Sequence, residues 1–184
     1  MSNPLANDNA ETGEGAEGLS GHSELSALWR LWNAARGARP MPARRDFTPE
    51  LLRPWLGNLA LIDATAEPVH LQYRLVGTHI VENLKFDPTG KGFEDFVVDP
   101  ANNPLTQGLY RCLLSGRPVF EVVRPRHNRF FSFDYNRLSL PLSADGRAVN
   151  MILMGEYVAS RGPSGGRSDR RDDRRDDGMA KIWI

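Results

Sequence analysis

The sequence predicts an α+β domain in which a five-stranded antiparallel sheet carries helices on one face, with a further helix flanking it at the N-terminal end. Three patterns lead to this prediction: an amphipathic helix opens the core, two alternating segments follow, and three more come after a helical insert. The core spans residues 23–158. A chain of that length buries about two thirds of the surface that it exposes when unfolded, so it can fold alone.

The first helix is expected over residues 23–36, where apolar side chains recur every three or four positions. This spacing forms one stripe of an amphipathic helix, made of Leu25, Leu28, Trp29, Trp32 and Ala35. Gly37 ends the helix, and the two prolines that follow prevent its continuation. A short second helix is expected from Pro49, with Thr48 as its N-cap.

The next two elements are expected to be the strands of a hairpin, over residues 59–63 and 71–77, with Pro68 in the turn between them. Residues 78–98 lack strand alternation and contain the turn signal Asp-Pro-Thr-Gly, so short helices and loops are expected there. An amphipathic helix over residues 103–115 completes this helical insert.

Three strands are expected after the insert, over residues 118–124, 130–140 and 149–158. The last two are joined by a turn that contains Asp145 and Gly146, a pair that supplies the positive backbone angles of a hairpin. The order is therefore helix, two strands, helical insert and three strands.

Both ends of the chain are expected to be disordered. Residues 1–22 form an acidic arm with few large apolar side chains, and residues 159–184 form an Arg/Asp-rich tail. The tail closes with an apolar tip around Trp183, which could dock on a partner or fold back on the domain. A frayed end without a role is the alternative interpretation.

Composition excludes several classes of protein. A membrane span needs about 18 consecutive apolar residues, and no apolar run in the sequence approaches that length. The first twenty residues lack the features of a secretory signal, so a cytoplasmic location is expected. The 23 Lys and Arg residues balance 23 Asp and Glu residues, which argues against a general nucleic-acid or membrane affinity. The single cysteine, Cys112, excludes an internal disulfide or a cysteine-based zinc cluster, and no metal site is expected.

Several motifs of the core resemble a known family. They are the Tyr-Arg-Leu-Val-Gly-Thr-His-Ile-Val run from Tyr73, Asp-Pro-Thr-Gly-Lys from Asp87, Leu-Pro-Leu-Ser-Ala-Asp-Gly from Leu140, and the Leu-Trp-Arg-Leu-Trp helix from Leu28. Together they resemble the short stand-alone PAS-domain proteins of proteobacteria, over about residues 24–157. The resemblance implies the PAS fold, a sheet and helical insert able to enclose a small ligand, and a role in sensing or protein–protein signalling.

Strand alternation identifies candidate walls for a ligand pocket. One face is expected to combine alternate residues of the last two strands, closed by side chains of the insert helix. Tyr135, His79 and Asn83 could orient a ligand, the last two being one helical turn apart. Ordinary core packing by the same residues is the alternative. The apolar candidates are Leu109, Cys112, Phe131, Phe133, Met151 and Leu153.

The sequence identifies no cofactor. Haem needs an axial imidazole or thiolate, for which His79 is the one candidate, and a flavin–thiol photoreceptor needs a polar pocket around its cysteine that Cys112 lacks. His79 with Glu82 is the one local acid–base pairing, and it is equally a solvated helix face. These observations argue against haem, flavin and catalysis.

Two surfaces are candidates for protein contact. The stripe of Leu28, Trp29 and Trp32 either packs on the sheet of its own chain or forms a homodimer interface. Basic side chains gather in the turn before the fourth strand, where a solvated turn is the alternative, at Arg124, Arg126 and Arg129.

The function expected from the sequence is that of a cytoplasmic regulatory protein with no attached catalytic output. It would sense a signal or contact a protein partner, with a small apolar ligand as one option. A small enzyme or carrier with a hydrophobic cavity on a cone-like α+β fold is the alternative. Nucleic-acid binding through the basic turn and the tail is a third, less supported interpretation.

Overall fold

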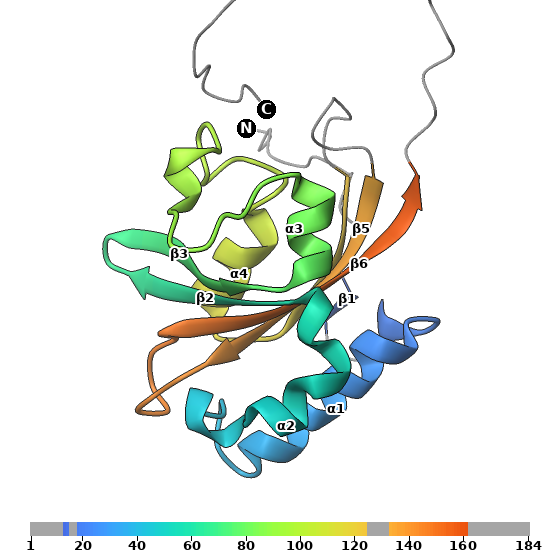
Figure 1. The fold of residues 1–184 in the computed structure, drawn as a ribbon. Helices are drawn as coiled ribbons and strands as arrows, with labels where there is room; N and C mark the ends of the chain where they lie inside the picture. The colour runs from blue at the N-terminus through green and yellow to red at the C-terminus, as the bar shows by residue number, and fades with distance from the viewer. Residues whose placement is uncertain (1–12, 15–17, 125–132, 162–184) are drawn as a thin grey trace, which may run out of the picture.

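The computed structural model describes residues 13–14, 18–124 and 133–161 (Figure 1). Its strands are β1 (Gly13–Glu14), β2 (Leu59–Ala66), β3 (Val69–Val76), β4 (Val119–Val123), β5 (Phe133–Leu142) and β6 (Met151–Arg161). Its α-helices are α1 (Ser23–Arg36), α2 (Pro49–Leu52), α3 (Thr78–Leu84) and α4 (Gln107–Ser115). Short 3₁₀ helices are η2 (Arg44–Asp46), η3 (Arg53–Asn58) and η4 (Phe93–Asp95).

The strands form one antiparallel sheet in the order β1-β4-β5-β6-β2-β3. Its five longer strands confirm the predicted sheet, and the predicted order of helix, hairpin, helical insert and three strands is also confirmed. The predicted N-cap of α2 is present, since the Thr48 hydroxyl accepts a hydrogen bond from the Leu51 amide at 3.4 Å.

The two faces of the sheet have different covers (Figure 1). Helices α3 and α4 lie on one side, here called the inner face, and α1 and α2 lie on the other, the outer face. The register assigns residues to these faces: Glu121, Arg137 and Glu156 form one cross-strand row on the inner face. The neighbouring row, which contains Leu138 and Gly155, belongs to the outer face.

Helix α1 packs tightly on the outer face. Leu28 and Trp32 are 0% and 3% exposed, and the Trp32 indole donates a hydrogen bond to the Pro141 carbonyl at 2.9 Å. A Cβ at Gly155 would lie 2.8 Å from a Leu28 methyl carbon, so the absence of a side chain on β6 allows this close approach. The predicted stripe is therefore packed on its own sheet.

The chain ends differ from the expected boundaries. Gly13 and Glu14, expected in a disordered arm, pair with Phe120 and Val119 at the edge of β4. Leu19 is buried in the core, and its carbonyl oxygen accepts a hydrogen bond from the Ser26 hydroxyl of α1. Strand β6 continues to residue 161, beyond the boundary expected at residue 158. No helix in the described ranges is long and apolar enough to cross a membrane.

Replacing Gly155 with valine tests the contact between α1 and the sheet. The added methyl groups would meet Leu28, and overpacking of this kind typically costs about 1–3 kcal/mol. We expect the thermal unfolding midpoint, followed by circular dichroism, to fall by about 3–10 °C. Thr65→Val, at an exposed position of β2, is the matched control and should leave the midpoint nearly unchanged. Equal midpoints for Gly155→Val and the wild type would contradict the packing.

Candidate functional site

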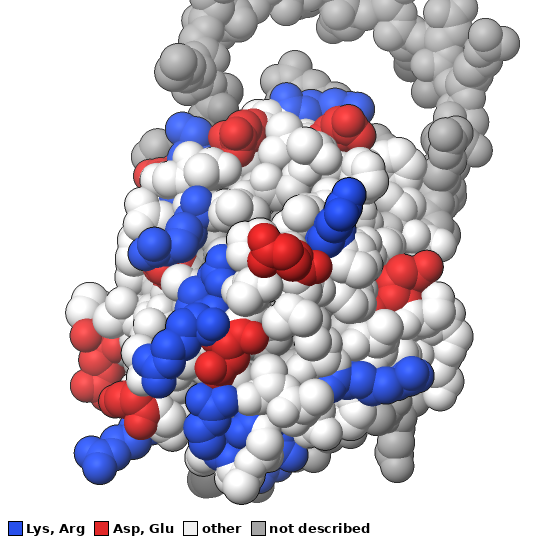
Figure 2. Space-filling view, turned by 60° about the horizontal axis from the view of Figure 1, so that its bottom comes forward, with Lys and Arg blue, Asp and Glu red and all other residues white. Residues whose placement is uncertain are grey.

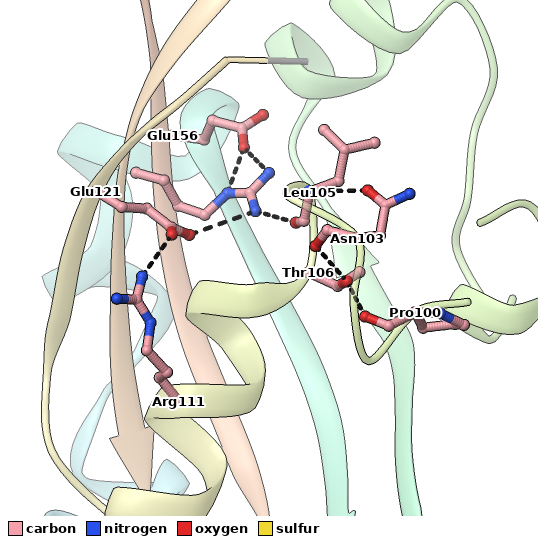
Figure 3. Close-up of polar contacts among 8 residues, drawn as sticks. Pro100, Asn103, Leu105, Thr106, Arg111, Glu121 and Glu156 are labelled. Carbon is pink, nitrogen blue, oxygen red and sulfur yellow. Dashed lines mark hydrogen bonds and ion pairs between the residues drawn. The ribbon is translucent and has the colours of Figure 1, made fainter. Parts of the chain in front are cut away.

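A cluster of charged side chains is buried on the inner face of the sheet, with Arg137 of β5 between Glu121 and Glu156. Figure 3 labels both carboxylates. The Arg137 guanidinium bonds to the Glu156 carboxylate at 2.7 Å through Nε and at 2.6 Å through Nη2. Its Nη1 lies 3.8 Å from Glu121 Oε1 and donates to the carbonyl oxygen of Leu105. These three charged side chains are only 5–6% exposed.

The antiparallel register builds this cluster. Glu121 of β4 pairs across the sheet with Arg137, which pairs in turn with Glu156 of β6. Directly opposite residues have neighbouring Cβ atoms, so three adjacent strands present the charges side by side. The sheet thereby places charges together that lie far apart in the sequence.

Helix α4 closes over the cluster at an unusually short distance. A Cβ at Gly108 would lie 1.9 Å from Glu121 Oε1, so no other residue fits there while the carboxylate keeps its place. One turn later, Arg111 reaches the same carboxylate, with 3.0 Å between Nη2 and Glu121 Oε2. Because the Arg111 side chain is 42% exposed, it connects the buried charges to solvent.

The turn before α4 fixes the carbonyl that Arg137 contacts. The Leu105 amide donates to Asn103 Oδ1 at 2.9 Å, and the Thr106 hydroxyl donates to the carbonyl oxygens of Asn103 and Pro100 (Figure 3). Asn103 and Thr106 are both buried. These hydrogen bonds hold the Leu105 carbonyl oxygen in place as an acceptor for Arg137. The contact between Arg137 and this oxygen links the helical insert to the sheet.

Burial controls the protonation of these groups. It raises the pKa of the Glu121 carboxyl, and the positive charges of Arg137 and Arg111 oppose this shift only in part. Burial would lower the pKa of Arg137, but the negative charges of Glu156 and Glu121 outweigh it and raise that pKa, so Arg137 stays charged. Burial also raises the pKa of the Cys112 thiol, which is therefore protonated and unreactive at neutral pH.

Comparison with models of known protein families identifies the family of this chain. A model described as "PAS domain" matches residues 20–153. The chain belongs to the PAS domain family. Members of this family have sensory or regulatory roles, are generally not catalytic, and commonly mediate protein interactions and dimerisation. No curated protein matches the chain.

The inner wall of this PAS domain differs from the predicted one. Phe133 and Tyr135 lie there, 6.5 Å apart edge to face, and Leu109 and Cys112 are buried in α4. Met151 and Leu153, however, belong to the outer face, because their neighbour Gly155 contacts α1. The inner residues of β6 are instead Ile152, Met154 and Glu156.

The inner wall also carries two carboxylates that were not among the predicted wall residues. Glu121 and Glu156 lie on it, and the pattern that could have found them is a single charged residue within an apolar strand. Glu121 interrupts the run Val-Phe-Glu-Val-Val, where both neighbours are apolar. A charge in such a strand, beneath a helix, indicates a buried partner.

The polar ligand candidates of α3 lie apart from the cluster. His79 is exposed, and its Nδ1 lies 2.5 Å from Asn58 Oδ1. Its ring packs on Gly57 of η3, so it faces that helix. Asn83, one turn later, is half-buried. Phe131 lies outside the described residues.

The interaction candidates are also divided. Leu28 and Trp32 are buried in the core of their own chain, so neither offers a surface to a partner. Trp29 is half-buried and remains partly accessible, and Arg124 is exposed. Arg126, Arg129 and Trp183 lie outside the described residues. Among the described residues, no group of three or more His, Cys, Asp or Glu side chains is placed to hold a metal ion.

Replacing Arg137 with methionine tests the cluster. The change leaves two buried carboxylates without their central cation, a loss that typically costs about 3–5 kcal/mol. We expect urea unfolding to show this decrease, and a triple variant with Glu121→Leu and Glu156→Leu added to recover most of it. Arg74→Met, which removes an exposed ion pair with Asp63, is the control and should cost less than about 1 kcal/mol. Equal losses for the two single variants would contradict the cluster's role.

The raised pKa of Glu121 predicts a pH dependence of stability. The folded chain binds this proton more tightly than the unfolded chain, whose carboxyl has a pKa near 4.5. The resulting stabilisation is complete below about pH 4.5 and is lost as the pH rises through the folded pKa. We expect the free energy of unfolding of the wild type, relative to Glu121→Gln, to fall as the pH rises above about 4.5. A constant or rising difference in urea unfolding would show that the pKa is not raised.

Proposed function

We propose that this PAS domain is a regulatory module that signals by contact with a protein partner, without enclosing an apolar ligand in its core. The observation that supports this proposal is the filled inner face, where Arg137 contacts two carboxylates and a backbone carbonyl. An apolar molecule placed there would leave buried charges without partners, which costs several kcal/mol. The ion pairs occupy part of the wall that was expected to be apolar.

Among the residues that the structure describes, the face that carries α1 and α2 has no continuous basic patch of the kind that nucleic acid needs (Figure 2). Figure 2 shows the side of the molecule that carries α1 and α2, where basic side chains are interspersed with acidic and uncharged ones. Nucleic acid binding depends on many cations that together neutralise the phosphate backbone. A surface of mixed charge is better suited to a protein partner of matching pattern.

A specific observation favours a second candidate, the sensing of a small polar ligand. The Tyr135 hydroxyl and Ser139 Oγ are buried on the inner side of β5 without a hydrogen-bond partner in the described part of the chain. Each unsatisfied group costs about 1–3 kcal/mol, which a bound polar molecule or a water would relieve. Burial raises the pKa of Tyr135 to about 12, so its hydroxyl is a donor at neutral pH.

Native mass spectrometry of the protein purified from its own cells separates these functions. If the domain signals by contact, the spectrum should show the mass of the chain without a bound molecule. A ligand that binds the folded state raises the thermal midpoint, so a titration with dodecanoate should shift the midpoint by less than about 1 °C if the core holds no apolar ligand. The positive test is in-cell cross-linking followed by reconstitution of the complex from two purified proteins. The chain without a bound small molecule must form this complex with the purified partner protein.

Three results would contradict the proposal. A stoichiometric polar molecule that is lost in Ser139→Ala would favour the second candidate. Saturable dodecanoate binding would favour the carrier or enzyme with a hydrophobic cavity. A bare chain that forms no reconstituted complex would leave contact signalling without a partner and overturn it.

A further inference from the structure

An open groove of about 490 Å³ lies at the start of α1, away from the buried cluster. Pockets of about 300–1,000 Å³ are the usual size for binding small groups, so the groove can receive a few side chains. Half of its lining residues are serine or glycine, and the full lining is Leu19, Ser20, Gly21, His22, Ser23, Ser26, Trp29 and Arg30.

Contacts with the core hold the wall of this groove in place. The His22 ring packs on Phe120 of β4 with 5.2 Å between ring centroids. The Ser26 hydroxyl donates to the Leu19 carbonyl at 2.9 Å, and the His22 amide donates to the same oxygen at 3.0 Å. Trp29 is half-buried and leaves part of its ring accessible. The groove is therefore a fixed shape with an aromatic side chain in its lining.

Strand β6 passes near the first turn of α1 before the described chain ends. The charge of Glu24, in the first turn of α1, acts on the phenol of Tyr157 in β6. From Tyr157 the strand continues for four residues to Arg161, which corresponds to about 13 Å. The tail that follows, residues 162–184, lies outside the described residues and contains the run Ile182-Trp183-Ile184.

We propose that this apolar run of the same chain docks in the groove against Trp29. The twenty residues between Arg161 and Ile182 are rich in Gly, Ser and charged side chains. A flexible chain of that length has an end-to-end distance of about 25 Å, which exceeds the about 13 Å of strand between Tyr157, near the first turn of α1, and Arg161. The effective concentration of the tethered run is then in the millimolar range, so weak contacts suffice.

Charge supports the same occupant. Arg30 is exposed at the groove and makes no hydrogen bond or ion pair within the described part of the chain. The tail carries Asp176 and Asp177 before the apolar run and Lys181 directly beside it, so the proposed orientation places the two carboxylates, and not Lys181, near this cation. A partner that binds the same groove must displace the tail, and the tail would then regulate access to it. This inference stands independently of the proposed function.

Nuclear magnetic resonance of the full-length protein tests the docking. The tip variant combines Ile182→Ser and Trp183→Ser in the full chain. We expect its backbone amide signals to differ from those of the wild type at residues 19–30. A synthetic peptide of residues 176–184, which includes Asp176 and Asp177, is added to the tip variant and should restore the wild-type positions. The same peptide with Trp183→Ala should bind at least tenfold more weakly.

Matched charge variants locate the contact. Arg30→Glu, placed in the tip variant, should weaken the peptide about two- to fivefold, the usual effect of an exposed charge pair. Arg45→Glu is the control, because this exposed arginine lies in η2 outside the groove, and it should leave the affinity unchanged. Equal affinities for the two variants would overturn the contribution of Arg30 and the proposed orientation.

Two further results would overturn the proposal. Spectra of the wild type and the tip variant that superimpose at residues 19–30, with no shift at millimolar peptide, would show that the groove does not bind this run. Shifts that grow with protein concentration, together with a doubled mass in sedimentation, would place the run on a second copy of the chain. Concentration-independent shifts in a monomer are the expected result.

Discussion

The ion-pair cluster around Arg137 is the interaction on which the rest of the inner side depends. A buried guanidinium is tolerated only when opposite charges and acceptors surround it, and here two carboxylates and a carbonyl do so. The carboxylates belong to β4 and β6, and the carbonyl belongs to the turn before α4. One side chain therefore joins three strands and the helical insert.

The constraint extends from the charges to the packing. Because the Glu121 carboxylate lies against the start of α4, position 108 must be a glycine. A helix with a side chain at this position could not approach the sheet as closely as α4 does. On the opposite face, Gly155 permits the same close approach by α1. Both helical layers thus depend on a glycine at the point of closest contact, one on the helix and one on the strand.

This interior bears on the way in which the domain can signal. In a domain with an apolar cavity, a ligand can enter by displacing weakly held side chains or water. Here, any molecule that enters beside Arg137 must replace charge-assisted hydrogen bonds, which are stronger than neutral ones. The surface, including the groove at the start of α1, is therefore the more accessible place for recognition.

The sequence by itself determined the order of the elements, the α1 stripe with Trp32, the cap at Thr48 and the PAS resemblance. These features depend on residues a few positions apart, whose spacing or capping chemistry is visible in the chain. The faces of the last strand could not be predicted, because residues 151–156 are all buried and both faces are covered by helices. When both faces of a strand are buried, neither set of alternate residues is polar, so the sequence pattern does not show which face a residue belongs to.

The buried cluster is likewise a result of tertiary structure alone. Arg137 and Glu156 are 19 positions apart, and only the register of β5 and β6 makes them neighbours. The sequence shows their charges but not their pairing, which is why the carboxylates of the inner wall were missed. Local chemistry determined which elements form, and long-range strand pairing decided which charged side chains are buried together.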